Sequence, residues 1–566
     1  MEFKEEIVKL LSKELHLKEQ ELNTLLETPP DQNLGDISLP CFKLSNLLKK
    51  DPKLIAIGLK DKLKISKDSI IKEIKVLGPY LNFYLNNELL TKSILTKILK
   101  EKQNYGLKKN NNKRIVIEFP SPNTNKPLHL GHLRNMALGD SISRILESQG
   151  NKVFRVNLNN DRGIHICKSM LAYKKWGSNK QPNKKSDHFV GDFYVLFAQK
   201  SKDNQNIELE AQEMLREWEK GDKETLKLWK KMNTWAINGF NETYNLFGLR
   251  KFDKVYYESK IYKKGKELIL KGLKDNIFEK DEKGAVIADL KELGKKVLLR
   301  EDGTSIYITQ DIYLAKLKYE DFKFNTSIYV TAIEQDFHFK VLFKVLKLLN
   351  FKFADSCYHL SHGMVNLPEG RMKSREGTIV DADDLIQELT EMAKKEITKR
   401  QKIKAKSIDK IAEKIAIAAL KCYLLKFTAH TDIVFNPKES ISFEGETGPY
   451  LLYSLVRANK ILEKAKSKII KFNTTLISTQ QEISLIKKLS EFPTIIEKTV
   501  NSYSPHILVE YSFKIAALFN LFYENCPVIN AENNDLKFAR TSIVQAYSVV
   551  LNSCLTLLGI EIVREM

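Results

Sequence analysis

The clearest hydrophobic pattern in the chain predicts a strand, a helix and a second strand in succession. Residues 114–119 form a short apolar run typical of a buried strand, and residues 120–127 are rich in proline and asparagine, which favour a loop. Apolar side chains recur at helical spacing from His132, and Gly150 marks a natural end. Residues 153–156 predict the second strand. Such a unit builds a parallel sheet, and ligands of parallel sheets collect at the carboxyl ends of the strands.

The sheet pattern resumes further along the chain. Residues 307–311, 327–331 and 357–361 are strand-like, and residues 335–349 predict a helix. Between the two parts lies an irregular insertion, from about residue 165 to 255. We therefore expect an α/β fold whose centre is a Rossmann-type, doubly wound parallel sheet with a connective insertion.

The insertion contains the run Asp187-His-Phe-Val-Gly-Asp-Phe-Tyr194 and a charged, aromatic section that predicts helix. Three tryptophans stand in that section, at positions 218, 229 and 235. We interpret them as core anchors rather than as platforms for stacking bases.

The pattern divides the chain into four expected parts. Residues 1–110 form a small α+β domain that ends in a polar linker, and residues 113–380 form the sheet domain. The pattern is helical afterwards, with a stem at 381–440 and an all-α bundle at 441–566. The expected helices of these last two parts are 383–399, 408–428, 447–466, 482–500, 505–525 and 535–558.

Length and charge change this picture in one respect. A chain of 566 residues is too long for one core, in agreement with several domains. Lysine and arginine exceed aspartate and glutamate by 21, which favours a polyanionic partner, although a solvated lysine-rich surface is the plainer alternative. The six cysteines show no Cys-x-x-Cys spacing, so we expect reduced thiols and a cytoplasmic location. No signal peptide or membrane-spanning run is found, so we expect no membrane partner.

The first candidate for chemistry is His129-Leu-Gly-His132, at the carboxyl end of the first predicted strand. Two imidazoles at this place can face a phosphate together, and Gly131 allows a flat ring or a backbone to approach closely. A histidine pair of purely structural use is the alternative.

A second candidate follows the strand at 357–361. His362-Gly-Met-Val365 leads into a basic loop bounded by glycines, Gly370-Arg-Met-Lys-Ser-Arg-Glu-Gly377. A loop of this kind at a strand's carboxyl end is suited to binding phosphates. Cys357, His359 and His362 superficially resemble a metal cluster, but no fourth ligand is nearby, and we expect no metal bound by protein side chains.

With both loops considered together, the chain resembles the class I aminoacyl-tRNA synthetases, and in detail the arginyl-tRNA synthetases. The resemblance rests on four stretches and on the carboxyl terminus, and it spans essentially the whole chain. These stretches are Glu118-Phe-Pro-Ser-Pro-Asn-Thr-Asn-Lys-Pro-Leu-His-Leu-Gly-His132, Asp187-His-Phe-Val-Gly-Asp192, Tyr307-x-Thr-x-Asp311, Phe443-Glu-Gly-Glu-Thr-Gly-Pro-Tyr-Leu451 and the ending 558–566.

The resemblance implies an arginine–tRNA ligase. The carboxylate of L-arginine would attack the α-phosphorus of ATP and expel pyrophosphate, and the arginyl group would pass to the 3′ end of tRNA(Arg) with release of AMP. Mg²⁺ would accompany ATP, held mainly by phosphates and water. Positioning and charge neutralisation should dominate such chemistry.

The resemblance also assigns residues. The catalytic group would be His129, His132, Lys126, Lys373, Ser374 and Arg375. Arginine would bind Glu118, Asn123, His129, Tyr307, Asp311 and Gln335, and ATP would bind Gly131, His132, His362, Gly363, Met364, Val365 and Met372. The usual Lys-Met-Ser-Lys-Ser loop reads Arg371-Met-Lys-Ser-Arg375 here, so the cation that reaches the pyrophosphate stays open among Lys373, Arg375 and Lys126.

Charge supports the choice of arginine. A guanidinium offers five donors and no acceptor, so its pocket must supply oxygens, which Asp311 and Tyr307 would provide. Asp311 as an ordinary helix cap is the alternative. Sites built on hydrogen bonds discriminate by roughly 10⁴-fold without editing, and no part of the chain resembles an editing domain.

For tRNA, the resemblance implies that the N-terminal domain contacts its outer corner and that the C-terminal bundle reads the anticodon. Tyr453, Arg457, Tyr523 and Met566 match positions that line the anticodon pocket in the family, although both tyrosines could equally be core residues. We expect a monomer, and we expect activation of arginine to require bound tRNA, as is usual in the family.

Three other functions stay open at this stage. A cysteinyl enzyme would need zinc-binding cysteines near the site, and none is placed for this. A non-catalytic RNA-binding paralogue would not need both histidines, the pocket acids and the basic loop. A small nucleotidyltransferase with the same histidine motif would not need the basic helical tail.

Overall fold

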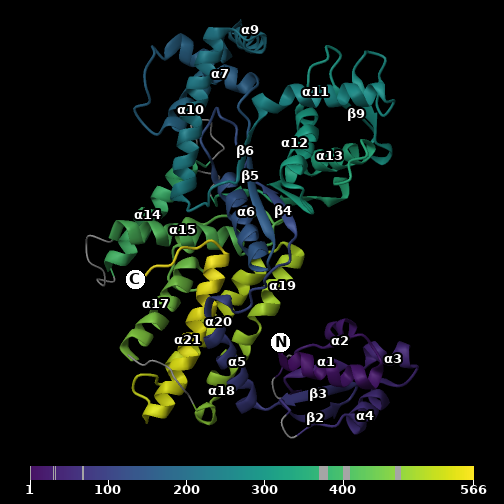
Figure 1. The fold of residues 1–566 in the computed structure, drawn as a ribbon. Coiled ribbons are helices and arrows are strands. Elements are labelled where there is room, and N and C mark those ends of the chain that lie inside the picture. Colours follow the sequence, from purple (N-terminus) through teal and green to yellow (C-terminus); the bar gives the residue numbers. More distant parts are fainter. Residues whose placement is uncertain are drawn as a thin grey trace. The chain divides into compact units, whose positions relative to one another are not determined.

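The computed structural model describes residues 2–29, 31, 34–66, 69–204, 206–368, 380–399, 408–465 and 473–566. The chain forms two compact units. Figure 1 labels their helices and strands. The first comprises Met1–Gly106, Ser454–Ile496 and Ser512–Ser553, and the second comprises Leu107–Tyr453, Glu497–Tyr511 and Cys554–Met566.

The second unit is built on a five-stranded sheet in which every pairing is parallel. In the order β11-β10-β4-β5-β6, its strands are Cys357–His362, Thr326–Ala332, Arg114–Glu118, Lys152–Asn159 and Lys254–Tyr257. The first strand along the chain, β4, therefore lies in the middle, with β5 on one side and β10 on the other. This order is that of a doubly wound fold with a switch point at β4, and it confirms the predicted fold class.

Helices cover both faces of the sheet, as parallel strands require. Val116 of β4 and Val156 of β5 pack in one cluster with α11 (Glu258–Lys274), α12 (Tyr307–Phe322) and α13 (Asp336–Leu348). Helix α6 (Leu130–Ser148) follows β4 and contacts β4, β5 and β10. Its predicted start and end are confirmed.

One strand predicted for this unit is wrong. Residues 307–311 are not a strand but the first turns of α12, because β-forming Tyr307 and Ile308 are overridden by an apolar face that continues through Ile312 and Ala315. Asp311 is thus the fifth residue of a helix and not its cap. A small antiparallel sheet before α12 was not predicted from the sequence. It consists of β7 (Glu279–Lys280), β8 (Val286–Asp289) and β9 (Lys295–Leu299).

The insertion is regular rather than irregular. It consists of the helices α7 (Ile164–Trp176), α8 (Ser186–Asp203), α9 (Asn206–Lys220) and α10 (Lys223–Leu246), which lie together in Figure 1. They share a core of their own. Trp218 is buried, and Trp229 and Trp235 pack against that core, which confirms the tryptophans as anchors.

The tail after residue 380 is helical, as predicted. Its helices are α14 (Ala382–Lys399), α15 (Ile408–Leu425), α16 (Pro437–Ser440), α17 (Gly448–Ala465), α18 (Gln480–Ser490), α19 (Phe492–Ser502), α20 (His506–Asn525) and α21 (Asn534–Leu557). The helix expected at 482–500 is two helices, because Pro493 cannot donate the hydrogen bond of a helix interior and sits in the first turn of α19 instead. The short strands β12 (Val365–Asn366) and β13 (Ile433–Val434) pair in parallel within the second unit.

In the first unit, the N-terminal part has the predicted α+β character. An antiparallel sheet in the order β1-β3-β2 consists of Ile37–Pro40, Tyr80–Leu85 and Ile71–Leu77. The helices are α1 (Glu2–Leu15), α2 (Glu19–Leu25), α3 (Phe42–Leu48), α4 (Pro52–Lys62) and α5 (Asn87–Glu101). Within the part of the chain that the structure describes, no helix is long and apolar enough to span a membrane.

The close approach of α6 to β4 yields a stability prediction. A Cβ atom on Gly139 would lie 2.3 Å from Cγ of the buried Phe119 ring, so Gly139→Ala must displace a helix or an aromatic side chain. We expect a loss of about 1–3 kcal/mol in the free energy of unfolding, measured by urea denaturation. In the matched control Gly58→Ala, the new Cβ meets nothing within 4 Å, and stability should rise by about 0.5–1 kcal/mol. Equal effects of the two substitutions would contradict the packing argument.

Candidate active site

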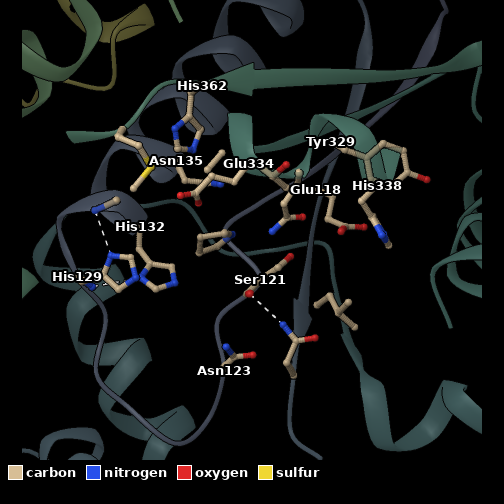
Figure 2. Close-up of a pocket in the computed structure, with 18 of the residues that line it drawn as sticks. Glu118, Ser121, Asn123, His129, His132, Asn135, Tyr329, Glu334, His338 and His362 are labelled. Atoms are coloured by element: carbon tan, nitrogen blue, oxygen red, sulfur yellow. Dashed lines mark hydrogen bonds between the residues drawn. The ribbon is translucent and has the colours of Figure 1, made fainter. Parts of the chain in front are cut away.

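A cavity of about 740 Å³ opens at the carboxyl ends of the parallel strands in the second unit. It lies at the switch point, with Glu118 at the end of β4, Leu158 near the end of β5, Tyr329 on β10 and His362 at the end of β11. In Figure 2, His129 and His132 stand on one side of the cavity, and His338 and Tyr329 stand on the other side, with Glu118 between them.

The cavity brings together most of the residues singled out in the sequence. Among its lining residues are Glu118, Asn123, Lys126, His129, Gly131, His132, Tyr307, Asp311, Gln335, His362, Gly363, Met364 and Val365. Met372, Lys373, Ser374 and Arg375 lie outside the described residues. Leu367 and Val380, on either side of that stretch, both line the cavity.

The two imidazoles of the His129-Leu-Gly-His132 motif also cap the helix that they begin. The backbone N–H of Gly131 donates to Nδ1 of His129, and the N–H of His129 donates to Nδ1 of His132, each over 3.2 Å. A backbone N–H is always a donor, so each Nδ1 must be an unprotonated acceptor. The neutral rings therefore carry their proton on Nε2.

Burial keeps these rings neutral. It lowers the pKa of His129 to about 4, with a further contribution from the charge of Lys126, and it lowers the pKa of His132 well below the ordinary value. The pKa of His362 is lowered to about 4, again mainly by burial. At neutral pH the motif thus presents two neutral N–H donors whose orientation is set by the helix cap.

A buried arginine that was not predicted from the sequence holds α6 to the segment after β11 and to residues 428–429. Arg134 is fully buried and donates to four backbone carbonyls over 2.8–3.3 Å. These carbonyls belong to Gly363, Met364, Thr428 and Ala429. The guanidinium therefore holds the start of the segment after β11 in a fixed position relative to His129 and His132. The sequence signal was a charge among the apolar positions of an otherwise buried helix.

On the opposite side, helix α12 presents Tyr307 and Asp311 one turn apart. Tyr307 is 67% exposed, while Asp311 is half-buried and its Oδ2 lies 2.7 Å from Nε2 of His338. Burial lowers the pKa of His338, but the hydrogen bond and charge of Asp311 outweigh burial and raise it above 6.5.

A second carboxylate near Asp311 was also missed. Glu258, the first residue of α11, is 4% exposed and interacts with Gln310 and with Arg162, whose Nη1 lies 3.6 Å away. Burial raises its pKa to about 7, and the charge of Asp311 adds to this rise. Glu258 does not line the cavity itself, but it lies close enough to Asp311 for the two charges to interact.

Glu118 is paired from behind. Its Oε2 lies 2.7 Å from Nζ of Lys318, a fully buried lysine of α12 whose ammonium also lies 3.5 Å from the centre of the Tyr329 ring. Glu118 lines the cavity, so its carboxylate links the buried lysine to the open space. Asn123 and Gln335, at the rim, are exposed.

The residues expected to read the anticodon fall in both units. In the first unit, Cζ of Arg457 lies 5.0 Å from the centre of the Tyr523 ring, which is 43% exposed, and Nη1 donates to Oδ1 of Asn520 over 3.0 Å. Tyr453 and Met566 belong to the second unit, and Met566 is buried.

Among the described residues, the group that could hold a metal ion by proximity is Asp187, His188 and Asp383, away from the cavity lining. Cys357, His359 and His362, whose spacing resembles a metal cluster, have other partners. His359 is hydrogen-bonded to Thr331 Oγ1 over 2.7 Å, and Sγ of Cys357 donates to the Phe353 carbonyl. His362 Nδ1 donates to its neighbour's carbonyl oxygen over 3.0 Å.

Comparison with known proteins gives three family matches along the chain. Residues 1–85 match "Arginyl tRNA synthetase N terminal domain", residues 94–437 match "tRNA synthetases class I (R), catalytic domain", and residues 451–566 match "DALR anticodon binding domain".

Individual relatives match over nearly their whole length. The arginine–tRNA ligase of Treponema denticola is 48% identical, covering 96% of this chain and 94% of the relative. That of Borrelia hermsii is 42% identical, covering 99% and 98%. Among solved structures, the arginyl-tRNA synthetase of Thermus thermophilus superimposes with a TM-score of 0.85 at 26% identity, covering 99% of both chains. The chain therefore belongs to the arginyl-tRNA synthetases of class I.

Proposed function

We propose that this protein is an arginine–tRNA ligase, which activates L-arginine with ATP to arginyl-adenylate and transfers the arginyl group to the 3′ end of tRNA(Arg). AMP and pyrophosphate are the other products. The observation that carries the proposal is that one cavity holds Asp311, an acid suited to a guanidinium, on one side and a pair of imidazole donors suited to phosphates on the other.

The imidazole side would serve the phosphates. His129 and His132 would donate from Nε2 to oxygens around the α-phosphorus, where negative charge accumulates as pyrophosphate leaves. Because both rings are neutral before ATP binds, the phosphates would meet donors that need no reorientation. Gly131, His362, Gly363, Met364 and Val365 would hold the rest of ATP, together with Met372.

The acid side would serve the side chain of arginine. Asp311 would accept the guanidinium in a bidentate pair, with the Tyr307 hydroxyl as a further acceptor. Glu258 would add a second negative charge, because an incoming cation lowers the pKa of a nearby carboxyl group. The amino acid lysine, as a competing substrate, carries a point charge in place of a planar guanidinium. It would leave acceptor oxygens of the pocket unpaired.

The α-amino and carboxylate ends of arginine would lie between the two sides. Glu118 would bind the α-ammonium group with the oxygen that Lys318 does not use, and Asn123 and Gln335 would complete the pocket. Lys126, Lys373, Ser374 and Arg375 would neutralise pyrophosphate. This arrangement directs the arginine carboxylate toward the α-phosphorus.

We also propose Mg²⁺ as the companion of ATP. Among the described residues that line the cavity, no three carboxylate, imidazole or thiolate ligand atoms lie within 4.8 Å of one another, so phosphates and water would supply most of the coordination, as Mg²⁺ commonly allows. The ion would neutralise charge on the phosphates.

The remaining parts of the chain would hold tRNA. Residues 1–110 would contact the outer corner of tRNA, and the sheet domain 113–380 would bind its 3′ end. The stem 381–440 would support the sheet domain, and residues 441–566 would read the anticodon. Tyr523, exposed with Arg457 against its ring, is suited to stacking an unpaired base. Tyr453 and Met566 would also take part in recognising the anticodon. The protein would act as a monomer in the cytoplasm.

The experiment that tests the function is charging of a tRNA transcript with each amino acid in turn. Arginine alone should be attached. In the Asp311→Asn variant, the KM for arginine should rise about 100-fold or more, because the charged partner of the guanidinium is lost, while the KM for ATP should change less than twofold. Equal changes in both constants would reject the guanidinium role of Asp311, and absence of arginylation by the unaltered protein would reject the function.

The double use of the histidines gives a second prediction. In His132→Asn, the amide oxygen can replace Nδ1 as the cap acceptor, but no atom replaces the Nε2–H donor. We expect kcat for pyrophosphate exchange to fall about 100-fold, or roughly 3 kcal/mol of transition-state stabilisation, with an unchanged melting temperature. His132→Ala should lose both cap and donor and should melt lower. If His132→Asn keeps its full rate, the phosphate role is wrong.

The pairing of His338 with Asp311 gives a third prediction, on pH. Protonated His338 places a positive charge beside the carboxylate that would bind the guanidinium, and its pKa lies above 6.5. The KM for arginine should therefore fall as the pH rises through that pKa, since deprotonation removes the competing charge. His338→Gln, which stays neutral, should flatten the profile. A profile that is unchanged in this variant would exclude His338 as the titrating group.

A further inference from the structure

The run Asp187-His-Phe-Val-Gly191 has no place in the chemistry described so far. It lies on α8 of the helical insertion, outside the cavity lining, and yet it is densely bonded. Lys185, just before α8, places its Nζ 2.9 Å from Asp187 Oδ2, 2.8 Å from Asp383 Oδ2 and 2.7 Å from Thr243 Oγ1. This ammonium bridges α8, α10 and the first turn of α14.

His188 reaches the same turn of α14. Its Nε2 lies 2.8 Å from Asp383 Oδ2 and 3.6 Å from Asp381 Oδ1. Thr243 donates to Asp383 Oδ1 over 3.0 Å, so both oxygens of Asp383 are bonded. Asp187 is fully buried. The carboxylate of Asp383 accepts hydrogen bonds from a lysine, a histidine and a hydroxyl group, and it is therefore held in one position.

The segment just before Asp383, at the start of α14, is itself paired with the start of α6. The N–H of Leu130 donates to the Val380 carbonyl over 2.9 Å, and the N–H of Ala382 donates to the Leu128 carbonyl over 3.0 Å. These two bonds lie on either side of His129. The backbone that carries the first signature histidine is therefore attached directly to the segment that Lys185 and His188 hold.

Close packing adds a second attachment. A Cβ on Gly191 of α8 would lie 2.8 Å from Cδ of Pro127, in the loop that leads to His129. A Cβ on Gly239 of α10 would lie 2.2 Å from Asp187 Oδ1. Only glycine at these positions lets α8 lie against the loop that leads to His129 and lets α10 lie against Asp187.

We infer that Lys185, His188 and Asp383 are positioning residues, which hold residues 380–382 and the loop 127–129 so that the imidazoles of His129 and His132 face the cavity in a fixed orientation. Helix α8 thus serves the adenylation step of the proposed function, on which this inference rests. The cluster is not a metal site, because the ammonium of Lys185 occupies the place of a cation between the carboxylates of Asp187 and Asp383.

The test compares Asp383→Asn and Lys185→Met with Asp384→Asn, a matched change at the next, exposed residue. Pyrophosphate exchange is measured with arginine, ATP and tRNA. The first two variants should lose at least 10-fold in kcat and change the KM for arginine less than twofold, because the acid side of the cavity is built by other elements. Lys185→Arg should recover part of the rate, and Asp384→Asn should match the unaltered protein. Gly191→Ala, which leaves every charge in place, should also lower kcat.

Several results would overturn the inference. One is an undiminished kcat in Asp383→Asn, and another is a rise in the KM for arginine as large as the fall in kcat. A third is a melting temperature of the unaltered protein that rises on addition of Zn²⁺ or Mg²⁺ without ATP and does so only while Asp383 is present, since that would assign the cluster to a metal. If the unaltered protein exchanges pyrophosphate with arginine, these results refute the positioning role alone; if it does not, the proposed function itself has failed.

Discussion

The structure of the active site depends on the hydrogen bonds that begin helix α6. A helix leaves its first N–H groups without partners, and here two of the donors at this end find the Nδ1 atoms of His129 and His132. Because those atoms are occupied, the tautomer of each ring is determined by the backbone. The same residues that start the helix therefore present Nε2–H groups to the cavity. At this point of the chain, the residues that form the helix cap are also the residues that would carry the chemistry.

Three sets of contacts keep that end of α6 in place. Arg134, buried among four carbonyl groups, attaches it to the segment after β11. Residues 380–382 pair with residues 128–130, and the glycine of α8 allows the insertion to lie against Pro127. Buried charges are costly unless they are paired or fully hydrogen-bonded, so these contacts admit few alternative arrangements. The orientation of the imidazoles is thus maintained from three directions.

The cavity also separates two kinds of electrostatics. On the α6 side, burial favours neutral imidazoles, which suits donors that must accept negative charge only during reaction. On the α12 side, the carboxylate of Asp311 lines the cavity and is hydrogen-bonded to His338, while the buried Glu258 nearby is paired with Arg162. Glu118 lies between them with Lys318 behind it. A substrate with a guanidinium at one end and a carboxylate at the other matches that division.

The sequence by itself determined the strand–helix–strand unit at residues 114–159, most of the helical tail and the motif residues, because periodicity and turn chemistry are local properties. The likeness of its motifs to a known family supplied the reaction. Only the tertiary structure decided that Tyr307 and Asp311 share a helix face, that Glu258 and Lys318 accompany them, and that Arg134 and the Lys185–Asp383 pair secure the histidines. Those contacts join residues up to some 300 positions apart. They depend on which buried charge finds which partner after packing, and no local pattern of apolar and polar positions encodes that choice.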